Sequence, residues 1–133
     1  MRKVIVLVLA LLSSALPVLA GECFYMAEAH VMNEHTRVRT IYVSDIVELS
    51  YPPGSSKCEF DANGNYFKRE EKLRDQFFLF LKAKKPGLVI SDVQAKWFSK
   101  EAEIRFLYKL LSEGKLPDPT QSVILVPGSF YKE

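Results

Sequence analysis

Apolar and polar positions follow strand-like and helical spacing in turn along the chain. Residues 24–32 are rich in strand-forming side chains, and residues 38–49 (VRTIYVSDIVEL) are β-branched and apolar. The polar segment between them, residues 33–36 (NEHT), is typical of a turn, so we expect the two runs to form a β-hairpin. Residues 51–56 (YPPGSS) contain two prolines and a glycine. Such a segment cannot continue a strand and predicts an exposed loop.

Two later segments have the apolar spacing of amphipathic helices. The first covers residues 66–85, with Asn65 as its expected N-cap and Pro86 directly after its end. The second begins after Ser99, its expected N-cap, and ends at Gly114. Each segment is therefore predicted to be a helix that buries an apolar face.

Further strand-like runs follow each of the two predicted helices. Residues 88–98 alternate between apolar and polar side chains, and residues 123–126 (VILV) form a continuous apolar run, typical of a strand covered on both faces. The element order is thus β-β-α-β-α-β. It predicts an α+β fold, a two-layer sandwich in which a mixed sheet carries both helices on one face. We expect residues 21–133 to form a single domain of this class.

Residues 1–20 have the pattern of a secretory signal peptide. Arg2 and Lys3 precede an unbroken apolar run at residues 4–12, and small residues ending at Ala20 supply a cleavage site. The run is too short to span about 30 Å of hydrocarbon, and an uncleaved N-terminal anchor is the alternative. We expect a mature chain that is soluble, in the periplasm or outside the cell. No later run predicts a membrane span.

Cys23 and Cys58 are the two cysteines of the chain. In the oxidising compartment that the signal peptide predicts, a structural disulfide between them is the simplest interpretation. The C-x-x-C spacing of redox-active pairs is absent. Free thiols, or a bond to another chain, are the alternatives.

The formal charge restricts the classes of partner. The 133 residues include 18 basic and 16 acidic side chains, which gives a net charge of +2. Arg2 and Lys3 account for this excess, so residues 21–133 are neutral and lack the basic character of a nucleic-acid binder. We therefore expect no nucleic-acid partner.

Motifs for metal binding and phosphate binding are weak. His30, His35 and Glu28 would supply three metal ligands from one hairpin, without a fourth ligand in view. Asp61 begins a segment similar to a calcium loop, but Lys72 stands where that loop needs a bidentate glutamate. The glycines are isolated, so no phosphate-binding loop is predicted. We expect no metal and no cofactor.

Aromatic residues beyond the two helical stripes are the main candidates for a binding surface. Tyr42, Phe78, Tyr108 and Tyr131 are interpreted as contacts with a partner protein or a second copy of the chain. The alternative is that helices lying side by side on a sheet bury these rings in the core. Trp97 is the candidate for stacking on a glycan.

Residues 93–103 (VQAKWFSKEAE), followed by Leu107, Leu110 and Gly114, resemble half of a SPOR domain. In that family a strand beginning with Val-Gln leads through Phe-Ser into a helix that carries Glu-Ala. The chain departs from the family because a single strand separates its predicted helices, where SPOR domains have two, and because no second matching half follows. SPOR domains bind the glycan strands of peptidoglycan, so the resemblance implies glycan binding in the bacterial envelope.

Three functions remain open from the sequence. The leading hypothesis is a small secreted, non-enzymatic domain that binds an envelope protein or associates with itself. The first alternative is a peptidoglycan-binding or glycan-binding module of SPOR-like type. The second is a small hydrolase, which would need a histidine close to Ser55, Ser56 or Ser129, although none of these serines lies in a G-x-S-x-G motif.

Overall fold

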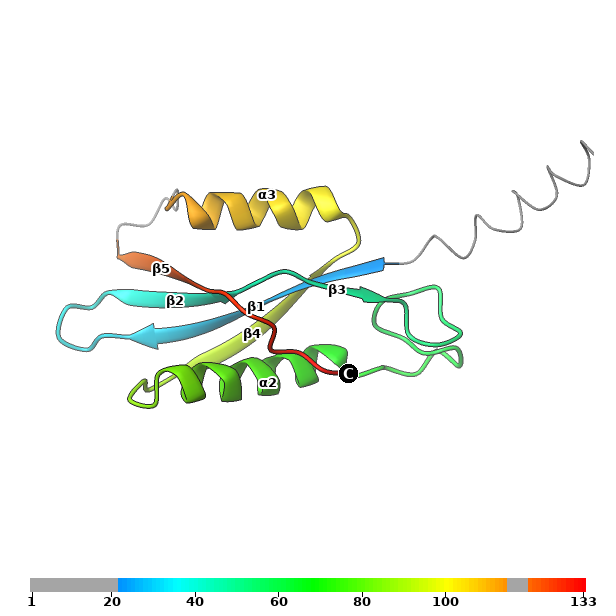
Figure 1. Ribbon diagram of the computed structural model, residues 1–133, viewed down its shortest axis with the longest axis horizontal. Helices are drawn as coiled ribbons and strands as arrows, with labels where there is room; N and C mark the ends of the chain where they lie inside the picture. Colours follow the sequence, from blue (N-terminus) through cyan, green and yellow to red (C-terminus); the bar gives the residue numbers. More distant parts are fainter. Residues whose placement is uncertain (1–21, 115–119) are drawn as a thin grey trace, which may run out of the picture.

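A computed structural model describes residues 22–114 and 120–133 of the chain (Figure 1). Its elements, in chain order, are β1 (Glu22–Met32), β2 (Arg39–Ser44), β3 (Val47–Ser50), α2 (Arg69–Lys84), β4 (Asp92–Phe98), α3 (Glu101–Ser112) and β5 (Gln121–Val126). The predicted signal peptide, residues 1–20, lies outside the described residues. In the described part of the chain, no helix has the length and apolar character needed to cross a membrane.

The long strand β1 is the centre of a mixed five-stranded sheet. Its C-terminal half pairs with β2 and its N-terminal end with β3, both antiparallel. Strand β4 pairs antiparallel with residues 24–30 of β1. Some of these residues also pair with β2 or β3, so β4 must lie on the opposite side of β1 from those two strands. Strand β5 runs parallel to β2. Among the described strands, β4 therefore forms one edge of the sheet. On the other side of β1, β3 and β5 are each paired with a single strand and form the opposite edge.

The hairpin of β1 and β2 confirms the turn predicted at residues 33–36, but the second predicted run is divided. Asp45 and Ile46 interrupt it between β2 and β3. At this break the backbone N–H of Ala27 donates to the side-chain oxygen of Ser44 at 2.8 Å, so that a hydroxyl replaces a main-chain acceptor. The buried amide of β1 thus keeps a partner where the neighbouring strand bends.

The α+β class, the mixed sheet and the two helices agree with the sequence prediction, and the observed order is β-β-β-α-β-α-β. The helices differ in placement from the expected single layer. Phe24 and Met26 pack with α3, whereas Ala27 and Ala29 pack with α2. Because successive residues of a strand point to opposite faces, α2 and α3 cover opposite faces of the sheet, as Figure 1 shows.

The local predictions at the helix starts and at the last strand also need correction. The N-caps are Lys68 and Lys100, neither of which makes a side-chain cap hydrogen bond, so Asn65 and Ser99 do not cap the helices. The apolar run 123–126 lies in the edge strand β5, where Ile124 remains 38% exposed. Long apolar runs thus do not distinguish a central strand from an edge strand that packs under a helix.

Candidate functional site

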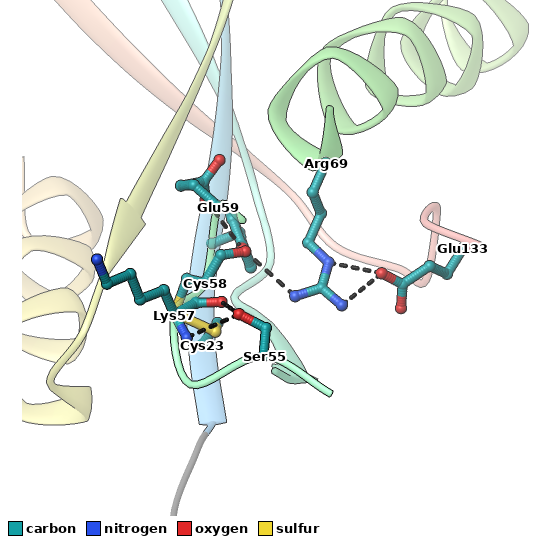
Figure 2. Close-up of a disulfide and its surroundings, with 8 residues drawn as sticks. Cys23, Ser55, Lys57, Cys58, Glu59, Arg69 and Glu133 are labelled. Atoms are coloured by element: carbon teal, nitrogen blue, oxygen red, sulfur yellow. Dashed lines mark hydrogen bonds and ion pairs between the residues drawn. A yellow bond between two sulfur atoms is a disulfide. The ribbon is translucent and has the colours of Figure 1, made fainter. Parts of the chain in front are cut away.

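The predicted disulfide between Cys23 and Cys58 is confirmed (Figure 2). It joins the start of β1 to the loop that follows β3, with the two Cα atoms 5.7 Å apart. Both cysteines are buried, in a cluster that also contains Tyr25 and Leu73. The disulfide therefore fastens the loop of residues 51–66 to the N-terminal end of the central strand.

Short-range hydrogen bonds shape this loop. The side-chain oxygen of Ser55 accepts from the backbone N–H of Lys57 at 3.0 Å and donates to the carbonyl of the same residue at 3.1 Å. Further along, Oδ1 of Asp61 accepts from the backbone N–H groups of Asn63 and Asn65, both at 2.9 Å. These turns, rather than the calcium loop considered above, account for the polar residues after Cys58.

An aromatic pocket lies between this loop and the end of β4. Trp97 is opposite Tyr25 in the antiparallel register of β4 and β1, and cross-strand partners share a face of the sheet. Trp97 thus lies on the face that carries the disulfide, with 42% of its surface exposed. The pocket has a volume of about 250 Å³. Its lining residues are Tyr51, Ser56, Lys57, Cys58, Glu59, Phe60, Trp97 and Ser99.

A second pocket of about 330 Å³ adjoins the first. Ser56, Lys57 and Phe60 line both pockets and form the wall between them. The second pocket is completed by the turn residues Gly54, Ser55, Asp61, Ala62 and Gly64. We call the two pockets together the aromatic groove. Among the described residues, it combines exposed aromatic rings with hydroxyl groups and a lysine.

Behind the groove lies a buried network of charged groups (Figure 2). The guanidinium of Arg69, in a residue only 1% exposed, forms an ion pair with Glu133 and lies 5.1 Å from the ring centroid of Phe67. The hydroxyl of Tyr25 contacts Oε1 of Glu59 at 3.1 Å and the carbonyl oxygen of Cys58 at 3.3 Å. Because the guanidinium also approaches Tyr25, the network connects α2 to the loop that carries the disulfide.

Burial controls protonation within this network. It raises the pKa of Tyr25 well above its ordinary value. It also raises the pKa of the Glu59 carboxyl, and the negative charge of Glu70 adds to this effect. Oε2 of Glu59 is buried without a hydrogen-bond partner among the described residues. The burial of Glu59 therefore works against its ionisation.

The four predicted partner contacts do not lie on one surface. Tyr42 is buried in the core beneath α2. Tyr108 is half-buried on α3, where its hydroxyl donates to Oδ1 of Asp45 at 3.3 Å. Tyr131 packs beside the disulfide cluster, and Phe78 on α2 is 38% exposed. Because α2 and α3 cover opposite faces of the sheet, no single partner surface contains all four rings.

The structure does not bring His35 to Ser55 or Ser56. His35 lies in the turn at the C-terminal end of β1, whereas Ser55 and Ser56 follow β3, which pairs with the N-terminal end of β1. At about 3.3 Å per strand residue, the length of β1 separates the two groups by roughly 30 Å. Within residues 22–114 and 120–133, no cluster of histidine, cysteine and acidic side chains could hold a metal ion.

The sequence indicated Trp97 as a binding residue, but it did not indicate that Lys57 and Phe60 lie beside it in the groove. Tyr51 begins the predicted exposed loop of residues 51–56, whereas Lys57 and Phe60 follow that loop. One signal was available: the cysteine of the predicted disulfide lies between Lys57 and Phe60 and would anchor them. Comparisons with protein-family models, curated proteins and solved structures gave no match.

Proposed function

We propose that the protein is a non-enzymatic glycan-binding module of the cell envelope, and that the aromatic groove is its binding site. The observation that carries this proposal is the position of Trp97 beside Tyr51 and Phe60 in one open pocket. Aromatic rings present flat apolar faces with negative electrostatic potential. The C–H groups on one face of a sugar ring are apolar and slightly positive, so they complement such a surface.

The rim of the groove supplies the polar half of sugar recognition. Ser56, Lys57 and Ser99 line the same pocket as Trp97. Hydroxyl groups both donate and accept hydrogen bonds, and an ammonium group donates up to three, which suits the hydroxyl groups around a sugar ring. A few such polar groups around an apolar floor are typical of small-molecule sites.

The disulfide and the N-terminal sequence support an extracytoplasmic location. Disulfides form and persist in oxidising compartments, such as the periplasm or the extracellular space. The bond between Cys23 and Cys58 fits such a compartment, and residues 1–20 have the pattern of an export signal. Envelope glycans are accessible to a protein exported in this way.

Co-sedimentation of the purified mature protein with peptidoglycan sacculi tests this proposal. We expect dose-dependent pelleting that soluble glycan fragments compete away, and about tenfold weaker binding after Trp97→Ala, because the variant loses the main stacking surface. Phe106→Ala is the matched control, since Phe106 is a more exposed aromatic ring on α3, away from the groove. Wild-type protein that stays in the supernatant, or equal pelleting of the Trp97 variant, would contradict the proposal.

A second candidate function, binding of an envelope protein or of a second copy, is favoured by the outer surface of α2. Phe78 and Leu79 are adjacent there, 38% and 66% exposed. Phe78→Asp is expected to abolish association while leaving the unfolding transition close to that of the wild type, because the ring is outside the core clusters. Light scattering after size-exclusion chromatography measures association. Global unfolding of the variant would instead assign Phe78 to the core.

A further inference from the structure

We propose that the preferred ligand of the aromatic groove is an acidic glycan, in which a uronic-acid ring stacks on Trp97 and its carboxylate pairs with the ammonium of Lys57. This inference rests on the proposed glycan-binding function and specifies its ligand. It follows from the position of Lys57 and from the orientation of the other charges that line the groove.

Lys57 lies at the centre of the groove, in the wall that the two pockets share. Its ammonium is 6.0 Å from the ring centroid of Phe60, and the side chain is exposed. Figure 2 shows it extending away from the ion pair of Arg69 and Glu133. None of the ion pairs of the described residues includes Lys57. An anionic ligand would therefore find an available cation beside the aromatic floor.

The two carboxyl groups that line the groove, unlike the Lys57 ammonium, already make hydrogen bonds within the protein. Glu59 is 9% exposed, and its Oε1 lies within hydrogen-bond distance of the Tyr25 hydroxyl inside the protein. Asp61 lines only the second pocket, where its Oδ1 already accepts two backbone N–H groups. Lys57 lines both pockets. In the first pocket the carboxyl of Glu59 is engaged by Tyr25 inside the protein, so a ligand carboxylate is better placed there than beside Asp61 in the second pocket.

This distribution specifies a disaccharide unit with one acidic and one neutral ring. The acidic ring would occupy the pocket of Trp97, and the neutral ring would place hydroxyl groups near Asp61 in the adjoining pocket. A cationic ligand does not fit, because its charge would face the Lys57 ammonium over the same Phe60 ring. The charge of the groove therefore favours a carboxylate-bearing sugar.

Calorimetric titration with cellobiose and cellobiouronic acid tests the inference. The two disaccharides share their linkage and differ only by oxidation of one C6 to a carboxylate. We expect the wild-type protein to bind the acidic disaccharide about three- to tenfold more tightly at low salt. We expect the difference to shrink in 0.5 M sodium chloride, because partly exposed ion pairs are weak and screened.

Substitution of the lysine separates its charge from the stacking surface. Lys57→Gln is expected to bind the two disaccharides equally, while Lys57→Arg keeps the preference for the acid. Lys72→Gln is the matched control: its ammonium also lies over a phenylalanine ring, 5.7 Å from the centroid of Phe67, but Lys72 does not line the groove. This control should retain the preference of the wild type.

The outcomes distinguish this inference from the function on which it rests. Equal affinity of the wild type for both disaccharides, with loss of both after Trp97→Ala, would overturn the acidic preference and leave glycan binding in place. A preference that survives Lys57→Gln would equally overturn it. Absence of binding to either disaccharide and to sacculi would overturn both proposals.

Discussion

At the scale of single residues, the buried ionisable groups behind the groove differ in how many ion-pair and hydrogen-bond partners they have. Arg69 has both a carboxylate partner in Glu133 and aromatic neighbours. Glu59 has the hydroxyl of Tyr25 on one oxygen and no hydrogen-bond partner on the other, among the described residues. A buried carboxylate that is only half satisfied disfavours its own ionisation. Stability should therefore depend on pH at Glu59.

We predict that Glu59→Gln becomes increasingly stabilising, relative to the wild type, as the pH rises from 4.5 to 8. The folded protein raises the pKa of Glu59, so the stabilising contribution of the neutral carboxyl is complete below the unfolded value and is lost as the pH rises through the folded value. Glutamine stays neutral throughout and keeps an acceptor for Tyr25. Urea unfolding at several pH values measures the free energy of unfolding of both proteins.

The control for this prediction is an exposed acid on the same side of the molecule. Glu71 lies in the first turn of α2 and is exposed, so Glu71→Gln should change the free energy of unfolding little at any of these pH values. A difference between wild type and Glu59→Gln that is constant with pH would show that Glu59 ionises normally in the fold.

At the scale of elements, the loop that forms the second pocket depends on two glycines in different ways. Both have positive φ, +75° at Gly54 and +79° at Gly64. A Cβ at Gly54 would lie 2.8 Å from the Cβ of Ala62, whereas a Cβ at Gly64 would meet no atom within 4 Å. A glycine is thus needed at position 54 both for the turn and because Ala62 packs closely against it. At position 64 a glycine is needed for the turn alone.

We predict that Gly54→Ala destabilises the protein by about 2–3 kcal/mol and Gly64→Ala by about 1 kcal/mol. Both substitutions place a side chain in the left-handed region, which disfavours it by about 1–2 kcal/mol, and only the first adds a collision. Gly54→Ala should also weaken glycan binding, since it moves Ala62 and the lining of the second pocket. Urea unfolding and disaccharide titration measure the two effects. Equal effects of the two substitutions would contradict the collision.

The elements also show how far the sequence predicts this fold. The hairpin, both helices and β4 follow from local periodicity, because each signal lies within one segment. The division of residues 38–49 depends on the Ser44 hydroxyl reaching an amide of β1, which is a contact between segments. The distribution of the helices over two faces likewise depends on β1 being apolar on both sides, from Cys23 to Ala27. Periodicity within single helices does not encode that choice.

At the scale of the whole molecule, the groove is assembled from segments that are distant in sequence. Tyr51, Lys57 and Phe60 precede α2, and Trp97 follows it on β4. The sequence indicated Trp97 and the cysteine pair separately, but their proximity depends on β1, which pairs with β4 and bears Cys23. The buried position of Arg69 was equally unpredictable, because its partner Glu133 is 64 residues away. The disulfide thus joins the central strand β1 to the loop that lines the proposed binding site.

We predict that the double variant Cys23→Ser/Cys58→Ser loses about 3–4 kcal/mol of stability, because the bond closes a sequence separation of 35 residues and restricts the unfolded chain. At a temperature where circular dichroism shows the variant still folded, its affinity for glycan should fall, since the loop lining both pockets is no longer fastened to β1. Addition of reductant to the wild type should reproduce both changes, and the variant itself should not respond to reductant. Unchanged affinity in the folded variant would mean that the hydrogen bonds of Ser55 and Asp61 hold the loop without the disulfide.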